Sequence, residues 1–243
     1  DQGGLPLLAP MSEVAGRLSV IEGAAHLKAH EGGRGILVSG VPGTKPADIV
    51  IIVGGVVGTN AARLAVGMGA RVTIFDRSLP RLRYLSDIFG TSVVTRYSTA
   101  GALAEAVQEA DMVIGAVLIP GASAPQLVSR AMLKDMKPGA VLVDVAIDQG
   151  GCFETSRPTT HQDPTYVIDN IVHYCVANMP GAVPLTSSEA LNNATLPHVL
   201  ALADNGMAAL QADQHLAAGL NVHQGKLVHP AVIDALGHLS AAE

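Results

Sequence analysis

The residues whose types and spacing best suit chemistry form a glycine-rich turn, Gly54-Gly55-Val56-Val57-Gly58, which Asp76 follows about 20 residues later. In such a turn the backbone can approach a pyrophosphate, and a helix that begins near Val57 aims unpaired N–H groups at its charge. Asp76 would accept hydrogen bonds from the hydroxyls of an adenosine ribose, and it would repel a 2′-phosphate. The pattern predicts binding of NAD in preference to NADP. An ordinary βαβ turn without a ligand is the alternative.

Val53 departs from the dinucleotide-binding pattern G-x-G-x-x-G, because it occupies the position of the first glycine. That glycine makes the tight passage from strand to helix. A β-branched side chain tolerates an extended φ but disfavours a positive one. We therefore expect a slightly wider turn, or a phosphate set further out, and weakened dinucleotide binding.

The second candidate for chemistry is Asp148, which precedes Gly150-Gly151. A strand is expected over residues 140–147. Period-two alternation places Asp144, Ala146 and Asp148 on one face of it. Only Asp148, at the end, is expected to reach a crevice, where it could hold a protonated amine, accept a proton from it or orient a ribose. The alternative is that Asp148 only caps the glycine turn.

Other kinds of site find little support. The nine histidines show no metal-ligand spacing with the two cysteines, so no metal site is predicted. No hydrolase nucleophile motif, Walker loop or paired-carboxylate motif is present. Cys175 lies in an apolar strand segment with His173 and Tyr174, where we expect a buried, inert thiol and packed or hydrogen-bonded rings.

The elements that must position these residues alternate between strands and helices, which predicts an α/β fold with a Rossmann-type doubly wound parallel sheet. Beyond Pro184 the pattern is purely helical, so residues 1–184 are predicted to form the NAD-binding domain and residues 185–243 a C-terminal helical extension. In such a sheet ligands bind beyond the carboxyl ends of the strands. That rule selects the loops at residues 54–58, 98–99, 117–121 and 148–151. Around the glycine turn and its βαβ unit we expect helices over 11–30, 80–89, 100–110 and 124–136, and strands over 92–95, 112–118, 140–147 and 172–176.

Composition narrows the class of protein further. The chain has 243 residues, of which 49% are hydrophobic and only 15% are charged, against about 25% charged in an average domain. Its net charge of −6 and lack of a basic block argue against nucleic acid or an anionic membrane as partner. The apolar runs are too short to span a membrane, and no signal peptide is visible. Two cysteines suit a reducing cytoplasm. The low charge fraction predicts that some surface is buried by partner subunits or by a missing domain, and together with the C-terminal helices it favours a homo-oligomer.

Six motifs are specific in combination. They are Met11-Ser12-Glu13-Val14-Ala15-Gly16-Arg17, Gly40-Val41-Pro42-Gly43, Gly54-Gly55-Val56-Val57-Gly58, Ile114-Gly115-Ala116-Val117-Leu118-Ile119-Pro120-Gly121, Asp144-Val145-Ala146-Ile147-Asp148-Gln149-Gly150-Gly151-Cys152 and Val176-Ala177-Asn178-Met179-Pro180-Gly181-Ala182-Val183-Pro184. Together they resemble bacterial alanine dehydrogenase over essentially the whole chain, and the soluble dinucleotide-binding subunit of proton-translocating transhydrogenase is a more distant relative. The resemblance implies a hexameric enzyme that converts L-alanine, NAD and water to pyruvate, ammonia and NADH, or runs the reverse reaction.

The resemblance also implies roles for individual residues. Asp148 would be the catalytic carboxylate. The cofactor would be bound by residues from several loops: Ser12 would contact it, Asp76 and Arg81 would hold its adenosine end, and Ser98 would flank that end. Val117 and Leu118 would line the crevice. The nicotinamide would be surrounded by Val145, Asp148, Asn178 and Met179.

The chain departs from the family in lacking the N-terminal segment that supplies the substrate-binding arginine and lysine and the catalytic histidine. L-Alanine and pyruvate are therefore expected as ligands only where a substrate site can form, and the truncated form is expected to be poorly active or inactive. Two alternatives stay open. One is a non-catalytic NAD-binding or oligomerisation module, and the other is a transhydrogenase-like dinucleotide-binding subunit.

Overall fold

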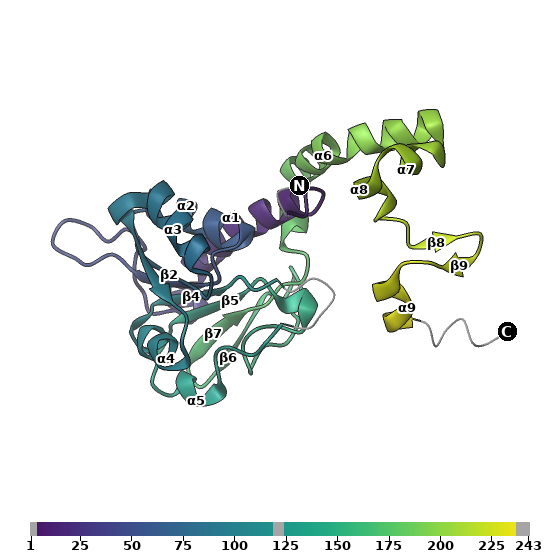
Figure 1. Cartoon of the computed structure of the whole chain (residues 1–243). Helices are drawn as coiled ribbons and strands as arrows, with labels where there is room; N and C mark the ends of the chain where they lie inside the picture. Colours follow the sequence, from purple (N-terminus) through teal and green to yellow (C-terminus); the bar gives the residue numbers. More distant parts are fainter. Residues whose placement is uncertain (1–3, 119–123, 237–243) are drawn as a thin grey trace. The chain divides into compact units, whose positions relative to one another are not determined.

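The computed structural model describes residues 4–118 and 124–236 (Figure 1). The chain divides into two compact units, with the boundary between Ser187 and Ser188. The first unit holds every candidate site residue, and the second consists of the C-terminal segment. We describe each unit by itself.

The first unit is built on a seven-stranded sheet in the order β3-β2-β1-β4-β5-β7-β6. All neighbouring strands are parallel except β6, which runs antiparallel to β7 at the edge. The chain moves outward from β1 to β3 and then returns to place β4 on the other side of β1, so the strand order reverses between β1 and β4. The strands are β1 Asp48–Ile52, β2 Arg71–Asp76, β3 Val93–Tyr97, β4 Met112–Gly115, β5 Val141–Asp144, β6 Thr165–Ile168 and β7 Ile171–Tyr174.

Helices cover both faces of this sheet, which confirms the predicted Rossmann-type doubly wound fold. In Figure 1, α1 (Ala9–His26), α2 (Val56–Gly67) and α3 (Leu79–Phe89) lie above the sheet, whereas α4 (Ala100–Glu109) and α5 (Arg130–Leu133) lie below it. The alternating side chains of β1 enter two separate hydrophobic clusters: Ile49 and Ile51 pack toward one face, and Val50 and Ile52 toward the other. A strand buried on both faces therefore reads as a continuous apolar run.

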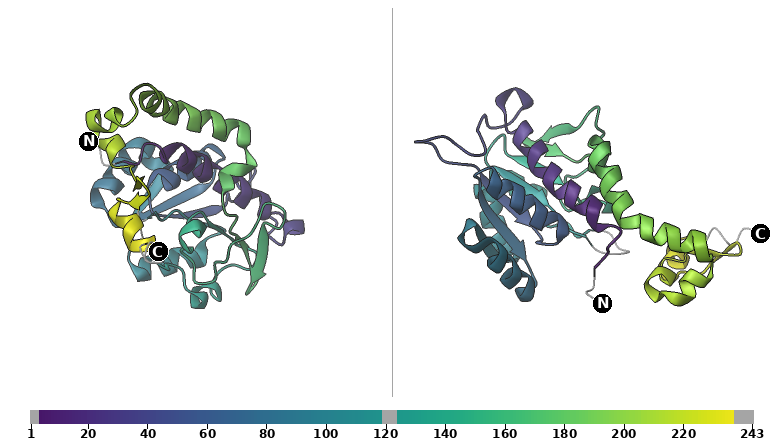
Figure 2. Two further views of the ribbon diagram at one scale, coloured as in Figure 1. Left: turned by 90° about the vertical axis from the view of Figure 1, so that its right-hand side faces the viewer. Right: turned by 90° about the horizontal axis from the view of Figure 1, so that it is seen from above.

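Helix α1 packs directly against α2, as Figure 2 shows from above. The contact depends on Gly16, where an added methyl carbon would lie 2.3 Å from the carbonyl oxygen of Val57. The missing side chain lets the middle of α1 approach the first turn of α2. This contact brings Ser12 and its neighbours on α1 toward the glycine turn.

Two helix boundaries predicted from sequence are wrong. Helix α1 ends at His26 rather than at residue 30, because the chain folds back and the Gly35 N–H caps the Leu27 carbonyl at 2.8 Å. A short 3-10 helix, Ala29–Glu31, follows. The helix expected over 124–136 is reduced to α5, Arg130–Leu133.

The preceding residues, 124–128, run in extended form beside Cys152 and Phe153, to which they are bonded through Leu127 N–H and a bridge at Val128. Pro125 lacks an N–H and biases the residue before it away from helix.

Strand lengths also differ from expectation. Strand β4 ends at Gly115 rather than at residue 118, and β5 ends at Asp144 rather than at residue 147. Beyond β5 the chain turns into a 3-10 helix, Ile147–Gln149. The edge strand β6 was not predicted at all, although β7 was. Part of the loop expected over 117–121 lies outside the described residues.

An ion-pair network closes the opposite end of the sheet, where the strands begin. Asp111 accepts a hydrogen bond from Asp48 N–H at 2.9 Å and pairs with Arg34 at 3.0 Å and Lys137 at 3.4 Å. Its side chain is only 8% exposed. These contacts tie β1 and β4 to the two loops that carry the cations, far along the strands from the glycine turn.

The second unit contains most of α6 (Pro184–Asn205), followed by α7 (Ala208–Ala212), α8 (Gln214–Ala217) and α9 (Pro230–Leu236). The expectation of purely helical structure is wrong at one place, where β8 (Val222–His223) and β9 (Lys226–Leu227) form a hairpin. Both residues of its turn, Gln224 and Gly225, have positive φ, as a two-residue hairpin turn requires. Over the described residues, no helix is long and apolar enough to cross a membrane.

Candidate functional site

The glycine turn joins the carboxyl end of β1 to α2, and each glycine has a separate physical role. A methyl carbon at Gly58 would lie 2.1 Å from the carbonyl oxygen of Val53, so this glycine lets the helix pack on the strand end. One at Gly54 would lie 2.4 Å from a methyl group of Leu85. At Gly55 an added carbon would meet nothing within 4 Å. The turn is therefore closed toward the protein and open at Gly55.

The prediction of a wider turn at Val53 is wrong, because this residue adopts a φ of +77°. Glycine adopts this left-handed conformation without a steric penalty, whereas valine does not. Neighbouring contacts impose it: the Val53 N–H donates to Phe75 O at 2.8 Å, and the side chain packs against the cluster below the sheet. The turn keeps its tight form, and the valine stores backbone strain instead.

Replacing Val53 with glycine or alanine separates this strain from the loss of packing. Both substitutions remove the packed side chain, but only glycine accommodates positive φ without a steric penalty. We expect Val53→Gly to be more stable toward urea unfolding than Val53→Ala by about 1 kcal/mol, and to bind NADH more tightly. Equal stability of the two variants would show that the residue at position 53 is not strained.

Asp76 lies at the end of β2, where its carboxylate supports the turn. Asp76 Oδ2 accepts from Gly54 N–H at 2.9 Å, and Oδ1 accepts from Ser78 N–H at 2.8 Å. The side chain stands beside the helix start with 9% of its surface exposed. Each oxygen retains a second acceptor site, which fits the expected contact with a ribose hydroxyl.

Arg81 and Ser98 join Asp76 around the turn. The Arg81 guanidinium donates to the carbonyl oxygens of Gly54 and Gly55, and to Thr59 Oγ1 at 2.7 Å. The Ser98 N–H donates to the Asp76 carbonyl at 2.9 Å. The structure therefore brings these predicted residues together. Arg81, which was expected to hold the adenosine end of the cofactor, is bonded to the glycine turn itself.

A cleft of about 200 Å³ lies beside the turn, at the carboxyl ends of β4 and β5. Seven residues that the sequence or the resemblance selected line it, and they come from five separate segments of the chain. Five further residues were missed, of which Leu8, Met11 and Ala15 share one helical face with Ser12, a spacing that could have revealed them. The predicted lining residues are Ser12, Val57, Val117, Leu118, Val145, Asp148 and Asn178, and the missed ones are Leu8, Met11, Ala15, Ala116 and Pro180.

Asp148 reaches the cleft, but not from a strand. It lies exposed in the 3-10 helix after β5. The expected alternation therefore does not apply, because β5 has already ended at Asp144. The two carboxylates lie in opposite environments: Asp144 is fully buried and Asp148 opens into the cleft.

Asn178 and Met179 are neighbours in the chain, but only Asn178 lines the cleft. Asn178 has a φ of +56°, and its carbonyl oxygen lies 3.2 Å from His161 Nε2. Met179 is 3% exposed and packs in the hydrophobic cluster above the sheet. The cleft is lined by Asn178 and Pro180 rather than by the Met179 side chain.

Three residues assigned to the core do pack there. His173 is fully buried, shares a hydrogen bond with Thr155 at 2.7 Å and stacks on Tyr166, and burial lowers its pKa to about 4. Burial raises the pKa of Cys175 to about 11 and also raises the pKa of Tyr174. None of the three lines the cleft. Residues 4–118 and 124–236 contain no group of three or more histidine, cysteine or acidic side chains that could hold a metal ion.

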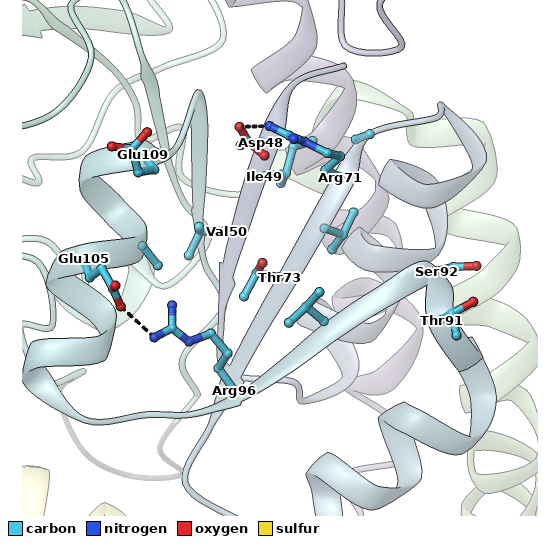
Figure 3. Close-up of a pocket in the computed structure, with 14 residues that line it drawn as sticks. Asp48, Ile49, Val50, Arg71, Thr73, Thr91, Ser92, Arg96, Glu105 and Glu109 are labelled. Carbon is cyan, nitrogen blue, oxygen red and sulfur yellow. Dashed lines mark hydrogen bonds and ion pairs between the residues drawn. The ribbon is translucent and has the colours of Figure 1, made fainter. Parts of the chain in front are cut away.

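A second and larger cavity, of about 590 Å³, lies toward the amino ends of β1 and β2 (Figure 3). Its two arginines are already paired: Arg71 with Asp48, and Arg96 with Glu105 at 2.8 Å. Ligands of doubly wound sheets bind at the other end of the strands. The smaller cleft is therefore the candidate site.

The turn and cleft fit a dinucleotide. The first turn of α2 begins at Gly55 without a capping side chain, so its backbone N–H groups are available to a pyrophosphate. Asp76 stands at the end of β2 for a ribose, and the cleft continues from Val57 toward Asp148 for the remainder of the ligand.

The order of the strands and the closed glycine turn define a Rossmann-type α/β domain. Comparison with known proteins identifies it further: residues 19–230 match the family described as alanine dehydrogenase/PNT, C-terminal domain, and the chain belongs to this family.

Individual relatives agree with this assignment. The chain is 64% identical to an alanine dehydrogenase of Halomonas elongata over 237 residues and 57% identical to one of Mycobacterium tuberculosis (strain H37Rv) over 236 residues. Each match covers 97% of this chain and 64% of the relative. The chain thus spans under two thirds of the length of the curated relatives it matches.

Solved structures give the same picture. An L-alanine dehydrogenase superposes with a TM-score of 0.94 at 55% identity, covering 97% of this chain and 65% of that one. A transhydrogenase from Sinorhizobium meliloti superposes with a TM-score of 0.72 at 26% identity, covering 93% of this chain and 61% of that one.

Proposed function

We propose that this chain is the NAD-binding part of an NAD-dependent alanine dehydrogenase, which converts L-alanine, NAD and water to pyruvate, ammonia and NADH. The observation that carries the proposal is the cleft, where seven expected residues from separate segments meet beside the glycine turn. Family membership supports the reaction class. Residues 1–184 would bind the cofactor, and residues 185–243 would belong to the substrate domain.

The chain's own residues would divide the work between them. The backbone of Gly55, Val56, Val57 and Gly58 would bind the pyrophosphate, and Asp76 would bind the adenosine ribose. When bound, the nicotinamide supplies the acceptor for the hydride of the substrate. Asp148, the one ionisable side chain among the described residues that line the cleft, would hold or move a proton at the substrate nitrogen or at the attacking water.

A titration of the chain with NADH and NADPH tests the cofactor assignment. We expect tighter binding of NADH, because Asp76 places a negative charge where NADPH carries its 2′-phosphate. Asp76→Ser should reduce the preference for NADH at least severalfold. Since Asp76 also accepts from Gly54 N–H, unfolding by urea must be followed in parallel. Equal or tighter binding of NADPH by the unmodified chain would refute the assignment.

A specific observation favours a second candidate, a non-catalytic NAD-binding module. Among the described residues that line the cleft, none is a lysine, arginine or histidine that could grip a substrate carboxylate. The two candidates differ in turnover, not in cofactor binding.

We further propose a cytoplasmic homo-oligomer. Two free, buried cysteines support a reducing compartment. Within α6 the exposed apolar side chains include Leu185, at 84% exposure, and Val199, at 56%. Apolar surface of this kind favours association. Light scattering at micromolar concentration is expected to give a mass above 24.9 kDa, and a strictly monomeric species would contradict the proposal.

A further inference from the structure

A buried carboxylate lies directly behind the turn that carries Asp148. Asp144, the last residue of β5, is fully buried. Its Oδ1 accepts hydrogen bonds from Ala146 N–H at 3.0 Å and from the Cys152 thiol at 3.5 Å, and its Oδ2 accepts from Cys152 N–H at 2.8 Å and from the Ser156 hydroxyl. Burial raises the pKa of Asp144, while these hydrogen bonds act in the opposite direction by favouring the charged form.

The two backbone donors flank the turn. Ala146 comes directly before residues 147–151, and Cys152 comes directly after them. The turn is closed at the same place by a bond from Gly151 N–H to the Ala146 carbonyl at 3.1 Å. Gly151 has a φ of +81°, and a methyl carbon added to it would lie 2.8 Å from Asp144 Oδ2. The carboxylate therefore fastens both ends of the segment.

We propose that Asp144 is a positioning residue, whose carboxylate holds the turn of residues 147–151 and the adjoining chain so that Val145 and Asp148 face the cleft. Asp144 itself does not line the cleft. Its predicted effect on cofactor binding rests on the proposed function, whereas its hold on the turn does not.

The chemistry of the four donors explains why an acid occupies this place. Two backbone N–H groups, one thiol and one hydroxyl converge on the side chain, and an ionised carboxylate is the side chain that only accepts. An amide would turn its NH₂ group toward at least one backbone donor. An apolar residue would leave every donor unsatisfied in the interior. A carboxylate alone satisfies both ends of the turn at once.

Asp144→Asn tests this arrangement while keeping the shape of the side chain. We expect the amides of Ala146 and Cys152 to exchange their hydrogens about 10- to 100-fold faster, the change expected for loss of a charge-assisted hydrogen bond. NADH affinity should fall about tenfold, because Val145 and Asp148 would no longer be held at the cleft. Hydrogen exchange and NADH fluorescence titration are the measurements.

Asp111→Asn is the matched control. Asp111, like Asp144, is a buried aspartate that accepts a backbone N–H, but it lies at the opposite strand ends. This variant should lose global stability and leave NADH affinity unchanged. Ser156→Ala removes the hydroxyl donor yet keeps both backbone bonds, so exchange in the turn should stay close to that of the unmodified chain.

The outcomes separate this inference from the proposed function. Unchanged exchange at Ala146 and Cys152 in Asp144→Asn would overturn the hold on the turn, and faster exchange with unchanged NADH affinity would overturn the role in cofactor binding. If the unmodified chain binds no NADH, the proposed function and the role of Asp144 in cofactor binding are both refuted. The exchange data would still test whether Asp144 holds the turn. If Asp144→Asn fails to fold, hydrogen exchange of the Ala146 and Cys152 amides in the unmodified chain is the test. Slow exchange supports the inference, and rapid exchange overturns it.

Discussion

Residues 1–243 incubated with L-alanine and NAD are expected to bind NADH but to form it at a rate about 10⁵-fold or more below that of a complete alanine dehydrogenase. Hydride transfer needs the substrate carboxylate fixed and its Cα hydrogen aimed at the nicotinamide. Such positioning contributes about 7 to 11 kcal/mol to catalysis. The described cleft lining contributes one carboxylate, Asp148, and no cation, so most of that contribution should be missing.

The measurement is NADH formation followed by absorbance, beside an NADH titration of the same preparation. The titration is the control, because it shows that the cofactor site is folded when turnover is absent. Turnover approaching that of a complete relative would contradict the prediction and would mean that other residues of this chain supply the missing roles. Asp148→Asn should abolish any residual turnover with NADH binding preserved, as expected for a residue that acts in chemistry rather than as a turn cap.

A pair of alanine substitutions in the glycine turn should separate folding from binding. Gly58→Ala is expected to lower the free energy of unfolding by about 2 to 3 kcal/mol, the cost of overpacking. Its methyl carbon would lie 2.1 Å from the Val53 carbonyl oxygen and 3.1 Å from an Ile51 methyl group, and the backbone atom has nowhere to move. Cofactor binding should be lost with the displaced helix.

Gly55→Ala is the matched variant, because its methyl carbon meets no protein atom within 4 Å. Stability should change by no more than about 0.5 kcal/mol. NADH affinity should nevertheless fall at least tenfold, since the methyl group occupies space through which the backbone approaches the pyrophosphate. Urea unfolding and NADH titration of both variants are the measurements. Gly55→Ala with native NADH affinity would place the pyrophosphate elsewhere.

Features set by neighbours in the chain were predictable. The turn at Gly54–Gly58, the start of α2 at Val56 and the acid at the end of β2 all depend on short-range spacing and the backbone freedom of glycine. The parallel sheet followed from apolar runs that alternate with helical segments. The hairpin at Gln224-Gly225 has a local signal of the same kind, a glycine between two short strands. The prediction of helix over the whole segment does not take this signal into account.

The remaining features depend on atoms that are distant in sequence. Val53 accepts positive φ because Phe75 and the cluster below the sheet hold it there, against its own preference. Residues 124–128 stay extended because Cys152 supplies a hydrogen-bond acceptor that no local pattern reveals. β5 ends where the buried carboxylate of Asp144 captures Ala146 N–H, and this places Asp148 in a turn rather than on a strand.

The amino-acid sequence by itself thus determined the fold class and the family, and it predicted seven residues that line the cleft, because spacing and residue type carry this information. Only the tertiary structure decided how they meet. It brought α1 against α2 at Gly16, gathered the cleft from five segments and assigned one aspartate to the interior and the other to the cleft. The physical reason is that burial and long-range hydrogen bonds exist only once the chain has folded, and they override local preference wherever the two conflict.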